Sequence, residues 1–126
     1  MDRQQTVTQS EWHIMELLWE SPRTLMELVT ILAQQQQWAK STVTTMVRRM
    51  DTKGLITFQT RGRTKIFTPA VSREEVALRE TNSLLDKAYQ GSIGLMISAM
   101  VHRNALTQED IDELYAILQE AEAKLE

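Results

Sequence analysis

Basic side chains are concentrated between residues 38 and 68, and they are the part of the chain with the clearest chemistry. This stretch has seven Lys and Arg residues and one acidic residue, so its net charge is +6, whereas the 126-residue chain as a whole has a net charge of -3. A basic region on an acidic protein indicates a surface that binds a polyanion such as duplex DNA. The seven residues are Lys40, Arg48, Arg49, Lys53, Arg61, Arg63 and Lys65.

The first half of this stretch predicts a helix whose outer face suits the major groove of DNA. A helix over residues 40–52 would end at Gly54, which stands where a left-handed terminating residue belongs. Short hydroxyl side chains on the outer face would let the helix approach base edges, and arginines would reach phosphates or guanine edges. A merely solvated face would hold more Glu and Lys, and threonines are poor helix formers, so the composition favours DNA contact. The outer residues are Ser41, Thr42, Thr44, Thr45, Arg48 and Arg49, and the inner ones are Val43, Met46, Val47 and Met50.

The second half of the stretch predicts a β-hairpin with a basic turn. A strand begins at Leu55, the turn is Arg61-Gly62-Arg63, and a second strand covers residues 65–68. The cations in and beside the turn would follow the phosphate backbone or enter the minor groove. By themselves they could equally be charges that protect an edge strand. Beside the preceding helix, DNA contact is the favoured interpretation.

Two further helices are predicted before the basic stretch. Thr8 with Glu11, and Thr24 with Glu27, form capping boxes in which each threonine begins a helix. The apolar residues that follow at helical spacing are Trp12, Met15, Leu18 and Trp19, and then Leu25, Leu28, Val29 and Leu32. The order helix, helix, helix, hairpin is that of a winged helix-turn-helix. We therefore expect a mainly α fold with a small β-hairpin, in which residues 1–70 form a winged-helix DNA-binding domain.

Residues 71–126 differ from residues 1–70 in charge and in pattern. They have a net charge of -6, against +3 for the first part, which indicates another protein as partner. Three helices are predicted, beginning after Ser72, Gly91 and Thr107, and their apolar residues are too one-sided to form a separate core. We expect an α-helical dimerisation region that buries them against a second copy. They are Leu95, Met96, Ile97, Met100, Val101, Ile111, Leu114, Tyr115 and Leu118.

The composition excludes several other classes of protein. The chain has no cysteine, so disulfides and thiolate metal sites are ruled out. Its two histidines, His13 and His102, are far apart in the sequence, and the acidic residues between 109 and 113 lie at a predicted helix start, where the macrodipole stabilises negative charge. We expect no metal and no cofactor. Because no nucleophile–base pair or phosphate-binding glycine loop is evident, we also expect no enzyme activity.

The sequence also bears on where the protein acts. No apolar run approaches the roughly 20 residues that a membrane-spanning helix needs. The first residues lack the apolar core of a secretion signal. We therefore expect a cytoplasmic protein with no membrane partner and no small-molecule substrate.

Three segments, taken together in this order, resemble the penicillinase repressor family (BlaI/MecI/CopY). They are SEWHIMELLW, WAKSTVTTMVRRMDTKGLI and GRTKIFTPAVSREE, and the resemblance extends from about Thr8 to Leu118. Members of this family are homodimeric winged-helix repressors that bind palindromic operators and control β-lactam resistance or copper-export genes. The resemblance implies that residues 40–49 enter the major groove, that residues 61–65 form the wing, and that the C-terminal helices hold a dimer.

Two features of the family pattern are missing from this chain. Antibiotic-responsive members are inactivated by cleavage of an Asn-Phe bond in the dimerisation region, and the matching position here is Ala99-Met100. Copper-responsive members have a cysteine-rich C-terminal motif that is absent here. The sequence therefore identifies neither the inducing signal nor the operator and the regulated genes. An alternative also stays open, in which the basic face of the winged helix binds an acidic protein partner instead of DNA.

Overall fold

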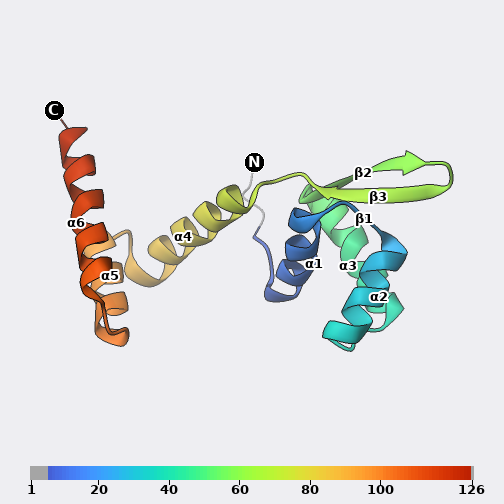
Figure 1. Ribbon diagram of the computed structural model, residues 1–126, viewed down its shortest axis with the longest axis horizontal. Coiled ribbons are helices and arrows are strands. Elements are labelled where there is room, and N and C mark those ends of the chain that lie inside the picture. The colour runs from blue at the N-terminus through green and yellow to red at the C-terminus, as the bar shows by residue number, and fades with distance from the viewer. Residues whose placement is uncertain (1–5, 126) are drawn as a thin grey trace. The chain divides into compact units, whose positions relative to one another are not determined.

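The computed structural model describes residues 6–125, which fall into two compact units (Figure 1). The first unit ends at Asn82 and the second begins at Ser83. This division falls inside α4, whereas we predicted that the DNA-binding and dimerisation roles divide after residue 70. The elements are α1 (Gln9–Glu20), β1 (Arg23–Thr24), α2 (Leu25–Gln35), α3 (Lys40–Lys53), β2 (Ile56–Arg61), β3 (Thr64–Pro69), α4 (Arg73–Tyr89), α5 (Ile93–Arg103) and α6 (Gln108–Ala123).

The first unit is a winged helix, as predicted, and its first two helices begin at the predicted capping boxes. The Thr8 hydroxyl accepts a hydrogen bond from the Glu11 N–H at 3.1 Å, and the Glu11 carboxylate accepts one from the Thr8 N–H at 3.0 Å. Thr24 and Glu27 make the same reciprocal pair at 3.1 and 2.8 Å. Each box satisfies N–H groups that a helix start leaves without partners. The starts of α1 and α2 are therefore fixed by local sequence.

α3 has the predicted end and three of the four residues predicted for its inner face, whereas Met46 is only partly buried and also lines a recess beside the outer residues. Val43, Val47 and Met50 are buried on one side of the helix. Gly54 has a φ of 82°, a left-handed conformation that costs glycine little, and the Leu55 N–H donates to the Met50 carbonyl at 3.0 Å. Since the buried residues hold one face of α3 against the core, the opposite face is left for contact with a partner.

The sheet has three strands, in the order β1-β3-β2, where the sequence predicted a two-stranded hairpin. The additional strand, β1, pairs antiparallel with β3 and places Arg23 opposite Phe67 and Thr24 opposite Ile66. A strand of two residues is too short to show the alternation by which strands are recognised in a sequence. Its consequence is structural, because β1 ties the start of α2 to the hairpin.

The core of the first unit is closed. Ile14, Leu28, Val43 and Met50 are completely inaccessible to solvent. Trp12 and Trp19, which the helical spacing placed in the core, pack against its edge with their rings 5.4 Å apart in an edge-to-face arrangement. The winged helix therefore buries most of its apolar residues within itself, and Met26 and Leu78 are exposed.

The first turn of α4 is fastened to α1. The Trp19 indole N–H donates to the Val71 carbonyl at 3.0 Å, and the guanidinium of Arg73 lies 4.7 Å from the centre of the Trp19 ring. Arg73 also donates to both carboxylate oxygens of Glu16, and these hydrogen bonds lower the pKa of that carboxyl below its ordinary value. Val76, one turn further along, is buried in the core. The beginning of α4 thus belongs to the winged-helix unit.

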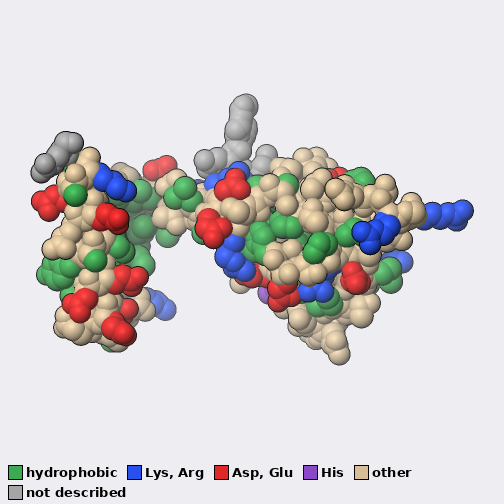
Figure 2. Space-filling model, turned by 45° about the horizontal axis from the view of Figure 1, so that its top comes forward, with side chains coloured by type: hydrophobic (Ala, Val, Ile, Leu, Met, Phe, Trp, Pro, Cys, Tyr) green, Lys and Arg blue, Asp and Glu red, His purple; other side chains and the backbone are tan. Residues whose placement is uncertain are grey.

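The second unit contains the end of α4 together with α5 and α6. Within α5 and α6, all of whose residues the structure describes, no side chain is fully buried. Ser92 and Thr107 cap these two helices through hydrogen bonds of 3.2 and 3.1 Å from the N–H groups of Leu95 and Asp110. Figure 2 shows hydrophobic side chains on the surface of this unit beside acidic ones. Within residues 6–125, no helix has the length and apolar character needed to cross a membrane.

Candidate nucleic-acid interface

The outer face of α3 divides into two rows of side chains. Thr44 and Arg48 form one row and line a groove on the side of the hairpin. The other row lies along a shallow recess on the opposite side of the helix and consists of Ser41, Thr42, Thr45 and Arg49, with Met46. All six residues predicted for the outer face of α3 are exposed or partly exposed. A helix inserted between two DNA backbones would need polar contacts on both of these sides.

The start of α3 differs from the other helix starts in residues 6–125. Its N-cap, Ala39, provides no side-chain hydrogen bond, and, as in α5, its first turn has no acidic residue. Each of the other five helices begins at a serine or threonine whose hydroxyl accepts a backbone N–H. The N–H groups at the start of α3 and the positive end of its dipole are therefore available to a phosphate, and Lys40 stands at the same end.

The hairpin carries its cations at a tight turn. Arg61 is opposite Thr64 in the pairing of β2 with β3, so Gly62 and Arg63 are the two turn residues. Gly62 has a φ of 65°, as the first central residue of a primed hairpin turn requires. Figure 2 shows basic side chains on the projecting end of this hairpin. The turn therefore presents Arg61 and Arg63 away from the core, as a wing that contacts phosphates would need.

Lys65 lies on the inner side of the same hairpin. Its ammonium is 4.4 Å from the centre of the Phe58 ring, and Phe58 is paired across the strands with Phe67 at 5.7 Å between ring centres. A cation over an aromatic face is attracted by the electron density of the ring. Lys65 is exposed and lines the groove between the hairpin and α3. The contact with Phe58 restrains its position.

Lys53 is held by an ion pair within the protein. Its ammonium lies 2.9 and 3.0 Å from the two oxygens of Glu11 and also donates to the Thr6 carbonyl at 3.2 Å. Glu11 is only 1% exposed. Because a buried carboxylate needs a cation, the pair joins the end of α3 to the start of α1. The DNA contact predicted for Lys53 remains a prediction, and this ion pair argues against it.

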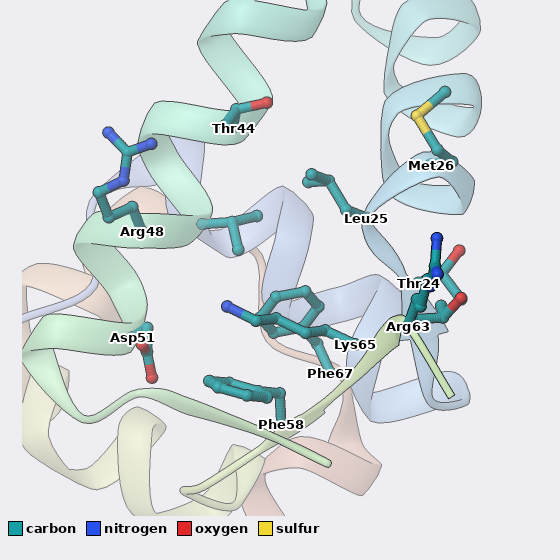
Figure 3. Close-up of a pocket in the computed structure, with 12 residues that line it drawn as sticks. Thr24, Leu25, Met26, Thr44, Arg48, Asp51, Phe58, Arg63, Lys65 and Phe67 are labelled. Carbon is teal, nitrogen blue, oxygen red and sulfur yellow. The ribbon is translucent and has the colours of Figure 1, made fainter. Parts of the chain in front are cut away.

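A groove of about 680 Å³ separates α3 from the hairpin and the start of α2. Figure 3 shows Phe58, Phe67 and Lys65 at its centre, with α3 on one side and α2 on the other. Its apolar surface comes from Leu25, Met26, Val47, Phe58 and Phe67, and its charged residues are Arg48, Asp51, Arg63 and Lys65. Two of the predicted DNA-binding segments, α3 and the wing, thus meet around one hollow.

Sequence reasoning missed the contribution of α2 to this surface. Thr24, Leu25 and Met26 line the groove, although the sequence marked them only as the start of a helix. Their placement depends on the pairing of β1 with β3, which no local pattern predicts. Trp38, just before α3, is partly buried with its ring 5.6 Å from that of His13 in an edge-to-face arrangement.

The residues predicted for dimerisation lie on α5 and α6, and most are exposed in the single chain. Leu95 is 60% exposed, Met100 53% and Tyr115 64%, and Ile97, Val101 and Leu118 are exposed as well. Met96, Ile111 and Leu114 are partly buried. Apolar residues at this density on a surface indicate a contact with another protein. Among the described residues, no three His, Asp or Glu side chains lie together as metal ligands would.

Comparison with known families supports the resemblance seen in the sequence. The profile of the penicillinase repressor family matches residues 7–120, which includes both the winged helix and the helices that follow it.

Two curated relatives and one solved structure are similar to this chain. The penicillinase repressor of Bacillus licheniformis is 27% identical over 115 residues, covering 90% of each chain. The methicillin resistance regulatory protein MecI of Mammaliicoccus sciuri is 21% identical over 113 residues, covering 89% of this chain and 92% of that protein. The solution structure of the DNA-binding domain of the repressor BlaI has a TM-score of 0.53 and 24% identity, and the match covers 60% of this chain and 93% of that domain.

Proposed function

Because this chain belongs to the penicillinase repressor family, we propose that it is a homodimeric transcriptional repressor that binds palindromic duplex operators through α3 and the wing. The observation that supports this most is the arrangement of α3. Hydroxyl residues and arginines occupy its exposed face, its start lacks a side-chain cap, and the basic wing stands beside it. The family contains winged-helix repressors, and no part of the proposal requires catalysis.

Affinity and specificity come from different residues in this proposal. The cations Lys40, Arg48, Arg49, Arg61, Arg63 and Lys65 neutralise phosphates, which supplies most of the sequence-independent binding. Ser41, Thr42, Thr44 and Thr45 lie near base edges and select the sequence. The Thr44 hydroxyl already donates to the Lys40 carbonyl at 2.9 Å, so it acts toward DNA as an acceptor. Occupation of a promoter by the protein would then block transcription.

A second copy is part of the proposal for two reasons. A palindromic operator has two half-sites, and a two-fold dimer presents one α3 to each. The exposed apolar residues of α5 and α6 would also remain in water in a monomer, which costs free energy. A self-complementary contact through these helices removes them from solvent and joins two winged helices. We place this repressor in the cytoplasm, where it meets chromosomal DNA.

The names of the relatives suggest what the operators control. One relative is called a penicillinase repressor and another a methicillin resistance regulatory protein, so we propose that this chain also regulates resistance genes. The position of the family's cleavage bond is occupied by Ala99-Met100, so release by that cleavage is not part of the proposal. Sequencing of genomic fragments that the purified protein selects would identify its operators and the neighbouring genes.

The salt dependence of DNA binding tests the phosphate contacts. We expect Arg63→Ala to weaken binding to all duplexes and to reduce the slope of log K against log salt by roughly one, because one phosphate contact is lost. Fluorescence anisotropy with a labelled random duplex measures this slope. Lys87→Ala, which removes one exposed cation outside the basic stretch, is the matched control and should leave the slope unchanged. If the wild-type protein does not bind random duplex even at low salt, the proposed function fails and the acidic-partner alternative is favoured.

The choice of bases tests the hydroxyl residues. We expect Thr45→Ala to cost on the order of 1–3 kcal/mol on a selected operator and to relax the preference at one base pair in each half-site. Binding to random duplex should change little, because phosphate contacts are retained. The measurement is a set of affinities for the operator and its single-base variants. An equal loss on all sequences would remove Thr45 from the base-reading set.

A further inference from the structure

We propose that the groove between α3, the start of α2 and the hairpin is a binding site for a small amphipathic anion, an aromatic carboxylate, and that its occupation displaces DNA. The site itself is argued from the winged-helix unit alone. Only the second part, displacement, rests on the proposed function.

The groove has an apolar floor that phosphate binding does not explain. Phe58 and Phe67 form a tilted pair of rings 5.7 Å apart, and Leu25, Met26 and Val47 complete the floor. Met26 is 53% exposed, so part of this apolar surface is open to a ligand. A volume of about 680 Å³ exceeds what one or two aromatic rings need, and typical ligand sites are of this size and are lined in this way. A phosphodiester would use the cations at the groove and leave the floor without a partner.

The charges around the floor select an anion. Arg48, Arg63 and Lys65 come from three places in the fold, namely α3, the turn and β3, and the one opposing charge is Asp51. The net charge of the lining is therefore +2. Lys65 is 4.4 Å from the Phe58 ring centre, so a ligand ring beside Phe58 would bring its carboxylate within reach of that ammonium. An ion pair formed beside an apolar floor is less screened by water than one on an open surface.

The position of the groove gives the ligand an effect on DNA. Arg48, Arg63 and Lys65 are cations that the proposed function assigns to phosphates, and a bound carboxylate would neutralise or cover them. DNA and ligand then compete for the same groups, so ligand binding raises the apparent dissociation constant for DNA. Such a ligand would act as an inducer without cleavage of the chain.

The first experiment measures binding of 2-naphthoate to the full chain without DNA, by titration of backbone amide NMR signals. We expect saturable binding, with the largest shifts in β2, β3 and the start of α2. The neutral 2-naphthamide, which lacks the charge, and acetate, which lacks the ring, should each bind about tenfold more weakly or worse, since each lacks half of the recognition. The site proposal is overturned if 2-naphthoate binding does not saturate, if the signals that shift belong to other segments, or if either control binds as tightly as 2-naphthoate.

Variants separate the ligand site from the DNA face. Met26→Ala changes an exposed side chain on α2 and should weaken 2-naphthoate binding several-fold while random-duplex binding stays the same. Phe58→Leu should also weaken 2-naphthoate binding, and Met26→Ala keeps the test decisive if Phe58→Leu lowers the stability of the fold or moves Lys65. Arg49→Gln, on the far side of α3, should weaken DNA binding only, whereas Lys65→Gln should weaken both. Unchanged ligand binding in both Met26→Ala and Lys65→Gln would overturn the assignment to this groove.

The second experiment adds 2-naphthoate to the complex of the protein with random duplex. The apparent dissociation constant for DNA should rise in proportion to ligand concentration once the ligand exceeds its own dissociation constant, and Met26→Ala should need several-fold more ligand. If the ligand binds and the DNA affinity does not change, displacement is wrong although the site stands. If the protein binds no DNA before ligand is added, the proposed function fails, and the NMR result decides the site independently.

Discussion

The two units of this protein treat their apolar residues in opposite ways. The winged-helix unit buries Ile14, Leu28, Val43 and Met50 completely, and its strands and helices close around them. In the second unit, α5 and α6 have no fully buried side chain, and Leu95 and Tyr115 are mostly exposed. Burial of apolar surface is the main favourable contribution to folding. The first unit can therefore be stable by itself, whereas the exposed apolar residues of the second would be buried only in the proposed dimer.

The same contrast is visible in how the units use charge. Among its described residues, the first unit pairs its one fully buried carboxylate, Glu11, with Lys53, and most of its other cations are exposed on α3 and the wing. The second unit is acidic and has its exposed apolar residues among those charges (Figure 2). A basic face suits DNA, and exposed apolar residues suit a contact with another protein.

Matched leucines give the largest test of this comparison. We expect Leu28→Ala to lower the free energy of unfolding of the first unit by about 2–5 kcal/mol, because it leaves a cavity in a closed core. Leu95→Ala removes the same atoms from a side chain that is 60% exposed, so its effect on unfolding of the first unit should be close to zero. Chemical denaturation followed by tryptophan fluorescence reports on the first unit, since Trp12, Trp19 and Trp38 all lie there.

The effect of Leu95→Ala should appear instead in self-association. Sedimentation at several concentrations should show a weaker dimer, by about tenfold for an interface leucine that contributes roughly 1.4 kcal/mol. If the wild-type chain sediments as a monomer at all concentrations, with and without duplex DNA, the exposed apolar residues of α5 and α6 do not form a dimer interface and the proposed homodimer is wrong.

Lys53 provides the next largest test, because it separates a structural cation from a DNA-binding one. We expect Lys53→Met to cost about 1–3 kcal/mol of stability, since it leaves the buried Glu11 carboxylate without its cation. The slope of log K against log salt for DNA should stay unchanged, in contrast to Arg63→Ala. Glu11→Gln combined with Lys53→Met should recover part of the loss, because glutamine at this position still caps α1 and carries no charge. A reduced salt slope in Lys53→Met would restore the predicted DNA contact.

Much of the winged helix could be predicted because its decisive signals are local. Threonine–glutamate pairs set the starts of α1 and α2, Gly54 sets the end of α3, and Gly62 sets the turn. Each acts within a few residues, so the sequence alone shows it. The outer face of α3 follows from helical periodicity in the same way, whereas its division into two rows is seen only in the structure.

What the sequence did not show depends on contacts between distant segments. β1 exists because Arg23 and Thr24 lie beside Phe67 and Ile66, more than forty residues later. The ion pair of Lys53 with Glu11 spans 42 residues, and neither residue has a neighbour in sequence that predicts it. A count of charges therefore included Lys53 among the DNA-binding cations. The groove went unnoticed for the same reason, since its lining comes from α2, α3 and the hairpin.

The smallest expected effect concerns the start of α4, which belongs to the first unit. The pKa of the Glu16 carboxyl lies below its ordinary value of 4.5, chiefly because Arg73 donates hydrogen bonds to it. A carboxyl whose pKa is lowered by folding stabilises the folded state above the unfolded pKa, and this contribution is lost as the pH falls through the folded pKa.

We expect the first turn of α4 to be slightly less protected from hydrogen exchange in Glu16→Gln near neutral pH. As the pH falls through the lowered pKa of the folded state, the wild-type carboxylate becomes protonated and the two proteins should converge. The effect is small because the pair is about half exposed and Trp19 still holds Val71. A large loss of protection along all of α4 would mean that this pair, rather than the buried Val76, fixes the boundary of the closed unit.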